Sequence, residues 1–229
     1  MLATRLLMDN LYALEDERVR QFLVIGEGRA LLFDVGFPDS GVLETVRSLT
    51  DKPVDVVMTH GDFDHSGGLV NVDVCRMHPG DWPLVQATDV ELLPLHEGDI
   101  CRCGGYRFEV IEIPGHTPGS VAFYDADRKL LLAGDTVQHG GPIYMFGTKR
   151  NLPGYIASLR KLKLLIPAEA TVLPCHCECP IDAGYIARNL EDAVALRDGK
   201  LTSEPHPSLP CRVYHGVSTD YLYDGEMLD

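Results

Sequence analysis

The feature that most constrains this chain is the segment at residues 59–68, which reads T-H-G-D-F-D-H-S-G-G. It follows residues 54–58, V-D-V-V-M, a short and mainly apolar run typical of a buried strand. Four groups able to bind a metal fall within six positions: His60, Asp62, Asp64 and His65. Unpaired carboxylates and imidazoles are costly to bury, so these four cannot all be core residues. On a strand-to-helix loop their side chains can converge on a metal, which predicts a metal site at the end of a buried strand.

The same segment resembles the signature of the metallo-β-lactamase superfamily, T-H-x-H-x-D-H-x-G-G after a strand. It departs from that signature only at Asp62, which stands where the family has its second histidine. Further family landmarks occur in the expected order along the chain. D-V-G at 34–36 resembles the D-x-G turn, and G-H-T-P-G-S at 115–120 resembles the G-H-T-x-G-S segment. G-D-T at 134–136 resembles the segment of the bridging aspartate, and P-C-H at 174–176 resembles the P-G-H-G segment. The resemblance thus covers most of the chain, from about residue 22 to residue 176.

This resemblance implies an α/β fold, the four-layer αββα sandwich with two mixed sheets and helices outside. We interpret residues 1–229 as a single domain, since the length permits one sizeable core or at most two small ones. The resemblance also implies a two-metal site with Asp135 as the bridging ligand. The remaining ligands would be His60, Asp62 and His116 for one metal, and Asp64, His65 and His176 for the other. A hydroxide between the metals would be the nucleophile, because two cations lower the pKa of bound water.

Position 62 leaves an alternative open. An aspartate reaches about as far as a histidine that coordinates through its near ring nitrogen, so Asp62 is either a ligand or a carboxylate beside an incomplete site. With Asp62 bound, two divalent cations, three aspartates and one hydroxide carry no net charge, whereas a histidine would leave one positive charge. Such a site is a weaker Lewis acid and favours Mn or Fe relative to Zn. We therefore expect two divalent metal ions, Zn or Fe/Mn.

Periodicity predicts strands mainly in the first half of the chain and long helices in the second. Hairpins are expected over residues 22–33, 101–108 and 121–133. A first helix is expected after residue 42, with Ser40 as its N-cap. Further helices are expected from Pro153 to Leu165 and from Pro180 to Gly199, with Gly199 as the C′ residue.

The charge composition limits the classes of partner that the chain can bind. The chain has 20 Lys and Arg against 34 Asp and Glu, a formal charge of −14, which argues against DNA, RNA or anionic membranes. We expect a small-molecule substrate, while the oligomeric state stays open. No signal-peptide or membrane-spanning run is visible, so a cytoplasmic location is expected. The seven cysteines are an odd number and are expected to be thiols rather than a disulfide framework, although the role of the cluster at 175, 177 and 179 stays open.

The resemblance favours a hydrolase that acts on an ester, lactone, thioester or related small substrate, with Asp64 and Asp135 as the catalytic carboxylates. Lactonases of the family place a tyrosine three residues after the bridging aspartate, where this chain has Gln138. His139 is the expected proton donor to the leaving group, with Tyr144 as the alternative. Glyoxalase II carries a long helical C-terminal domain, whereas 53 residues follow His176, predicted as one helix and two short strands. A diiron redox or sulfur-oxidising enzyme and a non-catalytic metal-binding domain are the alternatives.

Overall fold

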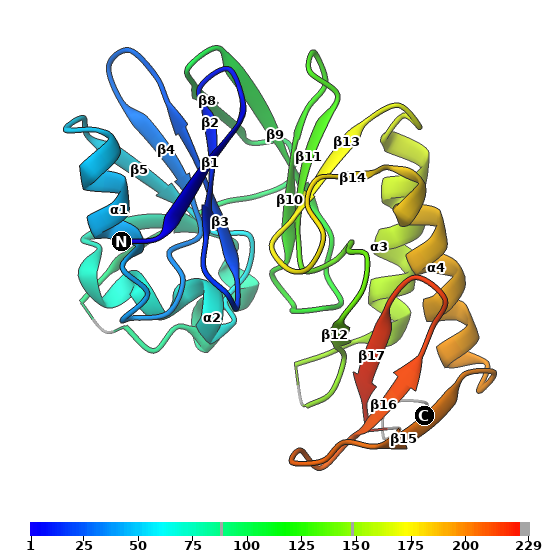
Figure 1. The fold of residues 1–229 in the computed structure, drawn as a ribbon. Coiled ribbons are helices and arrows are strands. Elements are labelled where there is room, and N and C mark those ends of the chain that lie inside the picture. The colour runs from blue at the N-terminus through cyan, green and yellow to red at the C-terminus, as the bar shows by residue number, and fades with distance from the viewer. Residues whose placement is uncertain (88, 148, 225–229) are drawn as a thin grey trace. The chain divides into compact units, whose positions relative to one another are not determined.

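The computed structural model describes residues 1–87, 89–147 and 149–224 (Figure 1). The chain divides into two compact units. Unit 1 is Met1–Ile111 with Phe123–Asp127, and unit 2 is Glu112–Ala122 with Arg128–Asp229. Both units combine helices with mixed sheets, as the predicted α/β class requires. The assignment of residues 1–229 to a single domain stays a prediction.

Unit 1 is built on a seven-stranded sheet whose spatial order follows the chain order. Its first four strands are antiparallel neighbours and its last three continue in parallel, so the sheet is mixed. The strands are β1 (Ala3–Met8), β2 (Leu11–Glu15), β3 (Arg20–Ile25), β4 (Ala30–Phe33), β5 (Val54–Val57), β6 (Val74–Met77) and β7 (Glu91–Pro94). Strands β8 (Ile100–Cys103) and β9 (Tyr106–Glu112) form the predicted hairpin around Gly104-Gly105.

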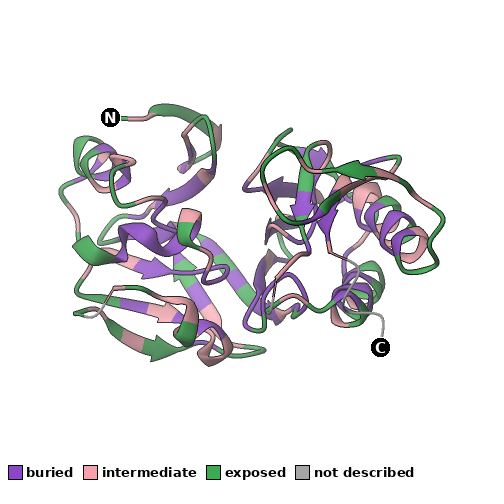
Figure 2. Cartoon of the chain, turned by 90° about the horizontal axis from the view of Figure 1, so that it is seen from below, coloured by how far each residue is buried: buried purple, intermediate pink, exposed green. Residues whose placement is uncertain are grey.

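The helices of unit 1 are short: α1 (Val42–Leu49), α2 (Phe63–Ser66), η1 (Gly67–Asn71) and η2 (Pro79–Leu84). Residues of β3 to β6 alternate between two buried faces. Leu32 and Val56 pack with Val42 and Val46 of α1 in one core. On the other face, the ring of Phe33 lies 5.0 Å from that of Phe108 and 4.9 Å from that of Phe123. Buried residues are purple in Figure 2, where the strand arrows also carry pink and green segments.

The predicted N-cap of α1 is wrong. Gly41, with φ of 76°, occupies the N-cap position, and the hydroxyl of Ser40 instead donates to the carbonyl of Phe37 at 2.8 Å. The chain enters this helix through a left-handed residue, which glycine adopts without strain. Serine is therefore used one position earlier, to close the turn that follows β4.

Unit 2 contains two separate groups of strands and two long helices. Strand β11 (Leu130–Gly134) pairs in parallel with β13 (Thr171–Pro174), which pairs antiparallel with β14 (Ile181–Asp182). A four-stranded sheet has the order β12 (Pro142–Tyr144), β17 (Asp220–Tyr223), β16 (Arg212–His215) and β15 (Thr202–Pro205). Strand β10 (Val121–Asp125) has residues in both units. Helices α3 (Leu152–Leu165) and α4 (Gly184–Arg197) pack side by side (Figure 1).

Helix α3 matches its prediction to within one residue, and Asn151 caps it by accepting from the backbone N–H of Gly154 at 2.9 Å. Helix α4 begins four residues later than predicted, because residues 181–182 pair with β13 as strand β14 instead. Its end is predicted correctly, with Gly199 in the left-handed region at φ 64°. The described part of the chain after His176 holds four strands rather than the two expected. None of the described helices has the length and apolar character needed to cross a bilayer.

Candidate metal centre

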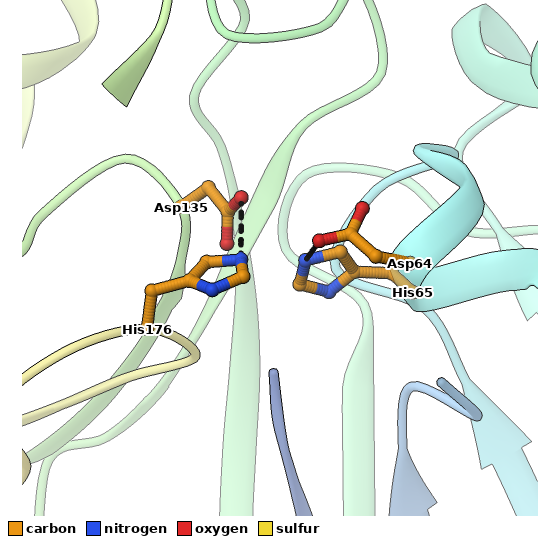
Figure 3. Close-up of side chains that lie close together, drawn as sticks. All are labelled: Asp64, His65, Asp135 and His176. Atoms are coloured by element: carbon orange, nitrogen blue, oxygen red, sulfur yellow. Dashed lines mark ion pairs between the residues drawn. The ribbon is translucent and has the colours of Figure 1, made fainter. Parts of the chain in front are cut away.

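The first set of predicted ligands lies in unit 1, at the carboxyl end of β5. The chain leaves β5 at Val57 and reaches His60 three residues later; Asp62 is the N-cap of α2, and Asp64 and His65 lie in its single turn. Nε2 of His60 lies 3.6 Å from Oδ2 of Asp62. Nε2 of His65 lies 3.6 Å from Oδ2 of Asp64, a pair that Figure 3 shows. The carboxylate of Asp62 makes no capping hydrogen bond to the helix, so it is directed to the histidine side of the loop.

A single buried carboxylate, that of Asp34, orients both histidines of this set. Its Oδ1 accepts from the backbone N–H of Thr59, and its Oδ2 accepts from the Thr59 hydroxyl, both at 2.7 Å. The same Oδ2 lies 2.9 Å from Nδ1 of His65. The Thr59 hydroxyl also lies 2.9 Å from Nδ1 of His60. Asp34 therefore reaches His65 directly and His60 through Thr59.

These contacts fix the tautomer of each ring. The ionised carboxylate can only accept, so the Thr59 hydroxyl donates to it and must accept from His60. Nδ1 then carries the proton in both His60 and His65, which leaves each Nε2 with its lone pair. A histidine that donates from one nitrogen to an outer carboxylate and presents the other nitrogen is the usual form of a metal-bound imidazole.

The loop between the two histidines is held from behind by a second buried carboxylate. Oδ2 of Asp81 accepts from the backbone N–H of Gly61 at 2.8 Å, and the hydroxyl of Ser66 donates to the carbonyl of Gly61 at 2.9 Å. A Cβ on Gly61 would lie 3.0 Å from atoms of Asp81 and Leu84, so no larger residue fits without a shift. The loop is thus held by contacts that use none of the predicted ligands.

The second set of predicted ligands lies in unit 2 and converges on Asp135. Oδ2 of Asp135 lies 3.2 Å from Nε2 of His176 (Figure 3) and 3.6 Å from Nε2 of His116. Asp135 directly follows β11 and His176 follows the parallel neighbour β13, so both lie at the carboxyl edge of the same strands. One carboxylate oxygen between two imidazole nitrogens fits the predicted role of Asp135 as a shared ligand.

The loop that carries Asp135 is held by buried polar groups that the sequence did not reveal. The hydroxyl of Tyr155 donates to the carbonyl of Thr136 at 2.7 Å. The side-chain amide of Asn189 accepts from the backbone N–H of Gln138 at 2.9 Å and donates to its carbonyl at 3.0 Å. The amide also donates to the hydroxyl of Ser218 at 3.0 Å. These contacts come from α3, α4 and the turn before β17.

A buried carboxylate anchors the turn before β17. Asp192 of α4 accepts from the backbone N–H groups of Val217 at 2.9 Å and of Ser218 at 2.8 Å. A Cβ on Gly216 would lie within 2.9 Å of the same carboxylate. The Asp135 loop is therefore tied, through Asn189 and Asp192, to the last strands of the described chain.

His139, the expected proton donor, belongs to a small polar cluster in unit 2. Its Nδ1 lies 2.5 Å from Oε2 of Glu178, and its ring stacks on that of Tyr185 with centroids 4.4 Å apart. Glu178 follows the predicted ligand His176 by two positions, and nothing in the sequence singled it out. Tyr144, the alternative donor, is 42% exposed on β12. The choice between His139 and Tyr144 stays a prediction.

Two buried cysteines of unit 1 are unreactive near neutral pH. Burial raises the pKa of Cys75 to about 12 and that of Cys101 to about 11. Both thiols are therefore protonated, and a protonated thiol is a poor nucleophile and a poor metal ligand.

Both ligand sets fit divalent transition metals. Imidazole nitrogens and carboxylate oxygens are donors suited to Zn, Mn and Fe, and a carboxylate at position 62 shifts the balance toward the harder of these. Within unit 1 the structure brings His60 to Asp62 and His65 to Asp64. Within unit 2 it brings His116 and His176 to Asp135.

Comparison with known proteins gives three kinds of match. The profile described as "Metallo-beta-lactamase superfamily" matches residues 15–74 and 75–176. A hydroxyacylglutathione hydrolase from Cereibacter sphaeroides is 31% identical over 218 residues, covering 90% of this chain and 83% of the relative. The acyl-coenzyme A thioesterase MBLAC2 of Gallus gallus is 27% identical over 69% of this chain and 72% of its own.

Two solved structures illustrate the structural matches. A protein solved in a di-iron-bound form, TTHA1623, is 29% identical with a TM-score of 0.62, covering 77% of this chain and 96% of that one. A metallo-beta-lactamase from Pontibacter korlensis has a TM-score of 0.70 at 19% identity, covering 85% of this chain and 99% of that one. The second match concerns the fold alone, and it confirms the predicted fold class.

Proposed function

Since this chain belongs to the Metallo-beta-lactamase superfamily, we propose that it is a metal-dependent hydrolase of thioesters with the two-metal site that the sequence resemblance implies. The proposed ligands are His60, Asp62, Asp64, His65, His116, Asp135 and His176. The observation that carries the proposal is the Asp34 network, which presents Nε2 of two histidines in the ligand form beside carboxylates.

Thioesters are the favoured substrates because of the similarity to relatives named for thioester hydrolysis. One is a hydroxyacylglutathione hydrolase that aligns over 90% of this chain. Another is an acyl-coenzyme A thioesterase. The two differ in the thiol they release, so the shared chemistry is attack on the carbonyl of a thioester. A lactone is less favoured, because Gln138 stands where lactonases of the family carry a tyrosine.

Two divalent metals at this site would supply an activated water and a Lewis acid for the carbonyl oxygen. The residues of the chain orient the ligands and transfer protons. Asp34 holds two rings in one tautomer, and Asn189 holds the backbone three positions after Asp135. His139 is oriented by Glu178 through Nδ1, and in its doubly protonated form it would give the Nε2 proton to the departing thiolate.

The test is a substrate screen on protein reconstituted with Mn, Fe or Zn. Acyl-glutathione and acyl-coenzyme A thioesters, an alkyl ester, a lactone and a phosphodiester are compared at equal metal loading. We expect kcat/KM for thioesters to exceed that for the other substrates by at least about tenfold, and chelation to abolish the activity. Turnover confined to lactones or phosphodiesters would overturn the proposal.

A second candidate, a diiron redox or sulfur-oxidising enzyme, is favoured by one observation, the di-iron-bound form of a protein 29% identical to this chain. The two candidates separate on iron-loaded protein. A hydrolase cleaves thioesters under argon at an unchanged rate, whereas the redox candidate consumes oxygen in proportion to product.

The cytoplasmic location is part of the proposal. Cys75, Cys101, Cys103 and Cys211 are unbridged thiols, and unbridged thiols are typical of a reducing compartment. A fractionation experiment that recovered the protein only from an exported fraction would contradict this location.

A further inference from the structure

Unit 1 carries an exposed aromatic side chain inside the metal-binding motif itself. Phe63 stands between Asp62 and Asp64 and is 43% exposed. All the aromatic residues of this chain lie in the described residues, and only Phe63 and Tyr144 are classed as exposed. Exposing a phenyl ring to water costs free energy, so the place of this ring next to two candidate ligands calls for a role.

Phe63 does not stand alone but forms one edge of an apolar surface. Its ring lies edge-on to that of Phe37, with centroids 5.9 Å apart. Pro38 adjoins the same ring: a Cβ on Gly67 would lie 2.7 Å from Cδ of Pro38 and 3.3 Å from Cε2 of Phe63. Phe37 and Pro38 come from the turn after β4, directly beyond the Asp34-Val35-Gly36 segment that supports the histidines. We call Phe37, Pro38 and Phe63 the acyl surface.

The charges around this surface select the kind of group that can lie on it. The guanidinium of Arg18 covers the ring of Phe37 at 4.0 Å, but Asp16 binds it through two hydrogen bonds of 3.2 Å. The hydrogen bond with Asp16, and then the charges of Asp39 and Asp64, raise the pKa of Arg18. The cation that covers the ring of Phe37 is thus already matched by a carboxylate. An anionic group would meet net negative charge there, whereas an uncharged apolar group would not.

We propose that Phe37, Pro38 and Phe63 bind the apolar acyl group of the substrate, and that the anionic thiol carrier lies elsewhere. This inference rests on the proposed thioester hydrolysis and adds to it the class of acyl group: uncharged and either longer than acetyl or aromatic. Phe63 is the specificity residue. Its ring is more exposed than that of Phe37, and it stands within the motif at residues 59–68. Because Phe63 does not belong to the ligand set, its replacement should leave metal binding intact.

The test compares Phe63→Ala with Val70→Ala, a control on an apolar side chain of the same unit that is 59% exposed and lies in η1. Octanoyl and acetyl thioesters of one thiol are the substrates. We expect Phe63→Ala to lower kcat/KM for the octanoyl substrate about tenfold, mainly through KM, and that for the acetyl substrate less than about twofold. Phe63→Leu should recover most of the loss, and Val70→Ala should match the wild type. Equal losses on both substrates, or none, would overturn the proposal.

Binding of the non-hydrolysable S-octyl thioether of the same thiol, followed by calorimetry, separates this inference from the proposed function. Tighter binding to the wild type than to Phe63→Ala supports the acyl surface even where no thioester is cleaved, in which case the proposed function fails alone. Equal Kd values in both proteins reject the acyl surface, whatever the activity. A change in oligomeric state in Phe63→Ala with an unchanged Kd would assign the surface to a protein contact and also reject it.

Discussion

Asp34→Asn is the substitution whose effect follows most directly from the geometry of the metal site. The amide has the shape of the carboxylate, so packing is preserved, but one of its two terminal atoms becomes a donor. If the amide nitrogen takes the place of Oδ2, it donates toward Nδ1 of His65 and toward the Thr59 hydroxyl. The hydroxyl must then donate to Nδ1 of His60. Both rings are forced to carry the proton on Nε2, the atom that would bind the metal.

The opposite orientation of the amide has a different cost. The nitrogen then takes the place of Oδ1 and faces the backbone N–H of Thr59, which is itself a donor. Two donors at 2.7 Å repel, so neither orientation of the amide reproduces the wild-type network. Losing the support of an outer carboxylate lowers metal affinity by roughly 10–100-fold. Because Asp34 serves one histidine of each proposed metal, we expect this loss, about 1.4–2.7 kcal/mol, for both metals.

Metal affinity is measured by competition with a chelator, and total metal by elemental analysis. Asp125→Asn is the matched control, because Asp125 is a buried carboxylate of the same unit that accepts from the backbone N–H of Arg107 at 2.9 Å. It should bind metal like the wild type. Nitrogen-15 NMR of the apo protein should show both rings protonated on Nδ1 in the wild type and on Nε2 in Asp34→Asn. Wild-type affinity in Asp34→Asn, or an equal loss in the control, would refute the tautomer argument.

Four further outcomes are expected. Asp64→Ala and Asp135→Ala should each lower kcat by at least about a thousandfold and leave the circular dichroism spectrum unchanged; wild-type turnover in both would contradict their role. Asp62→His should raise the affinity for Zn relative to Mn about tenfold in competition experiments, and an unchanged ratio would remove Asp62 from the ligand set. His139→Ala should lower kcat more for thiols of high pKa than for activated thioesters, whereas equal losses would mean that the residue only shapes the site. Burial raises the pKa of Glu15, but the side chains of Arg5 and Arg20 outweigh this effect, so the pKa is lowered. Glu15→Gln should therefore lower the free energy of unfolding by at most about 1 kcal/mol at pH 7, and by nothing at a pH well below 4.5. A loss that persists in acid would contradict the role of these ion pairs.

The parts of the structure that could be predicted depend on residues close together in the sequence. The strand at β5, and the close approach of the His60 and His65 rings at 4.0 Å beyond it, follow from four apolar residues and a dense motif within ten positions. Helix α3 is predicted to within one residue, because its apolar residues recur at helical spacing and a proline stands in its first turn. The C-terminal end of α4 is equally local, since Gly199 adopts the left-handed conformation there without strain.

The parts that escaped prediction depend on contacts between distant residues. Asp34 lies 31 positions from His65, and its role in setting ring tautomers is invisible without the fold. Asn189 lies 51 positions from Gln138, and a lone asparagine in a helix gives no signal of such a bond. Strand β14 is only two residues long, too short to give a strand pattern in the sequence. Its pairing with β13 replaces the helical turn that was predicted there. Glu178 was missed because its partner His139 is 39 positions away.

The bonds from α4 to the turn before β17 have a consequence for the order in which the molecule is made. A ribosome releases this chain from its N-terminus, and the early part folds first. The supports of His60 and His65 described above, from Asp34 to Asp81, have all been synthesised by residue 81. Those of Asp135 include Ser218, which is synthesised 137 residues after Asp81. A nascent chain therefore completes the supports of His60 and His65 well before it completes those of Asp135.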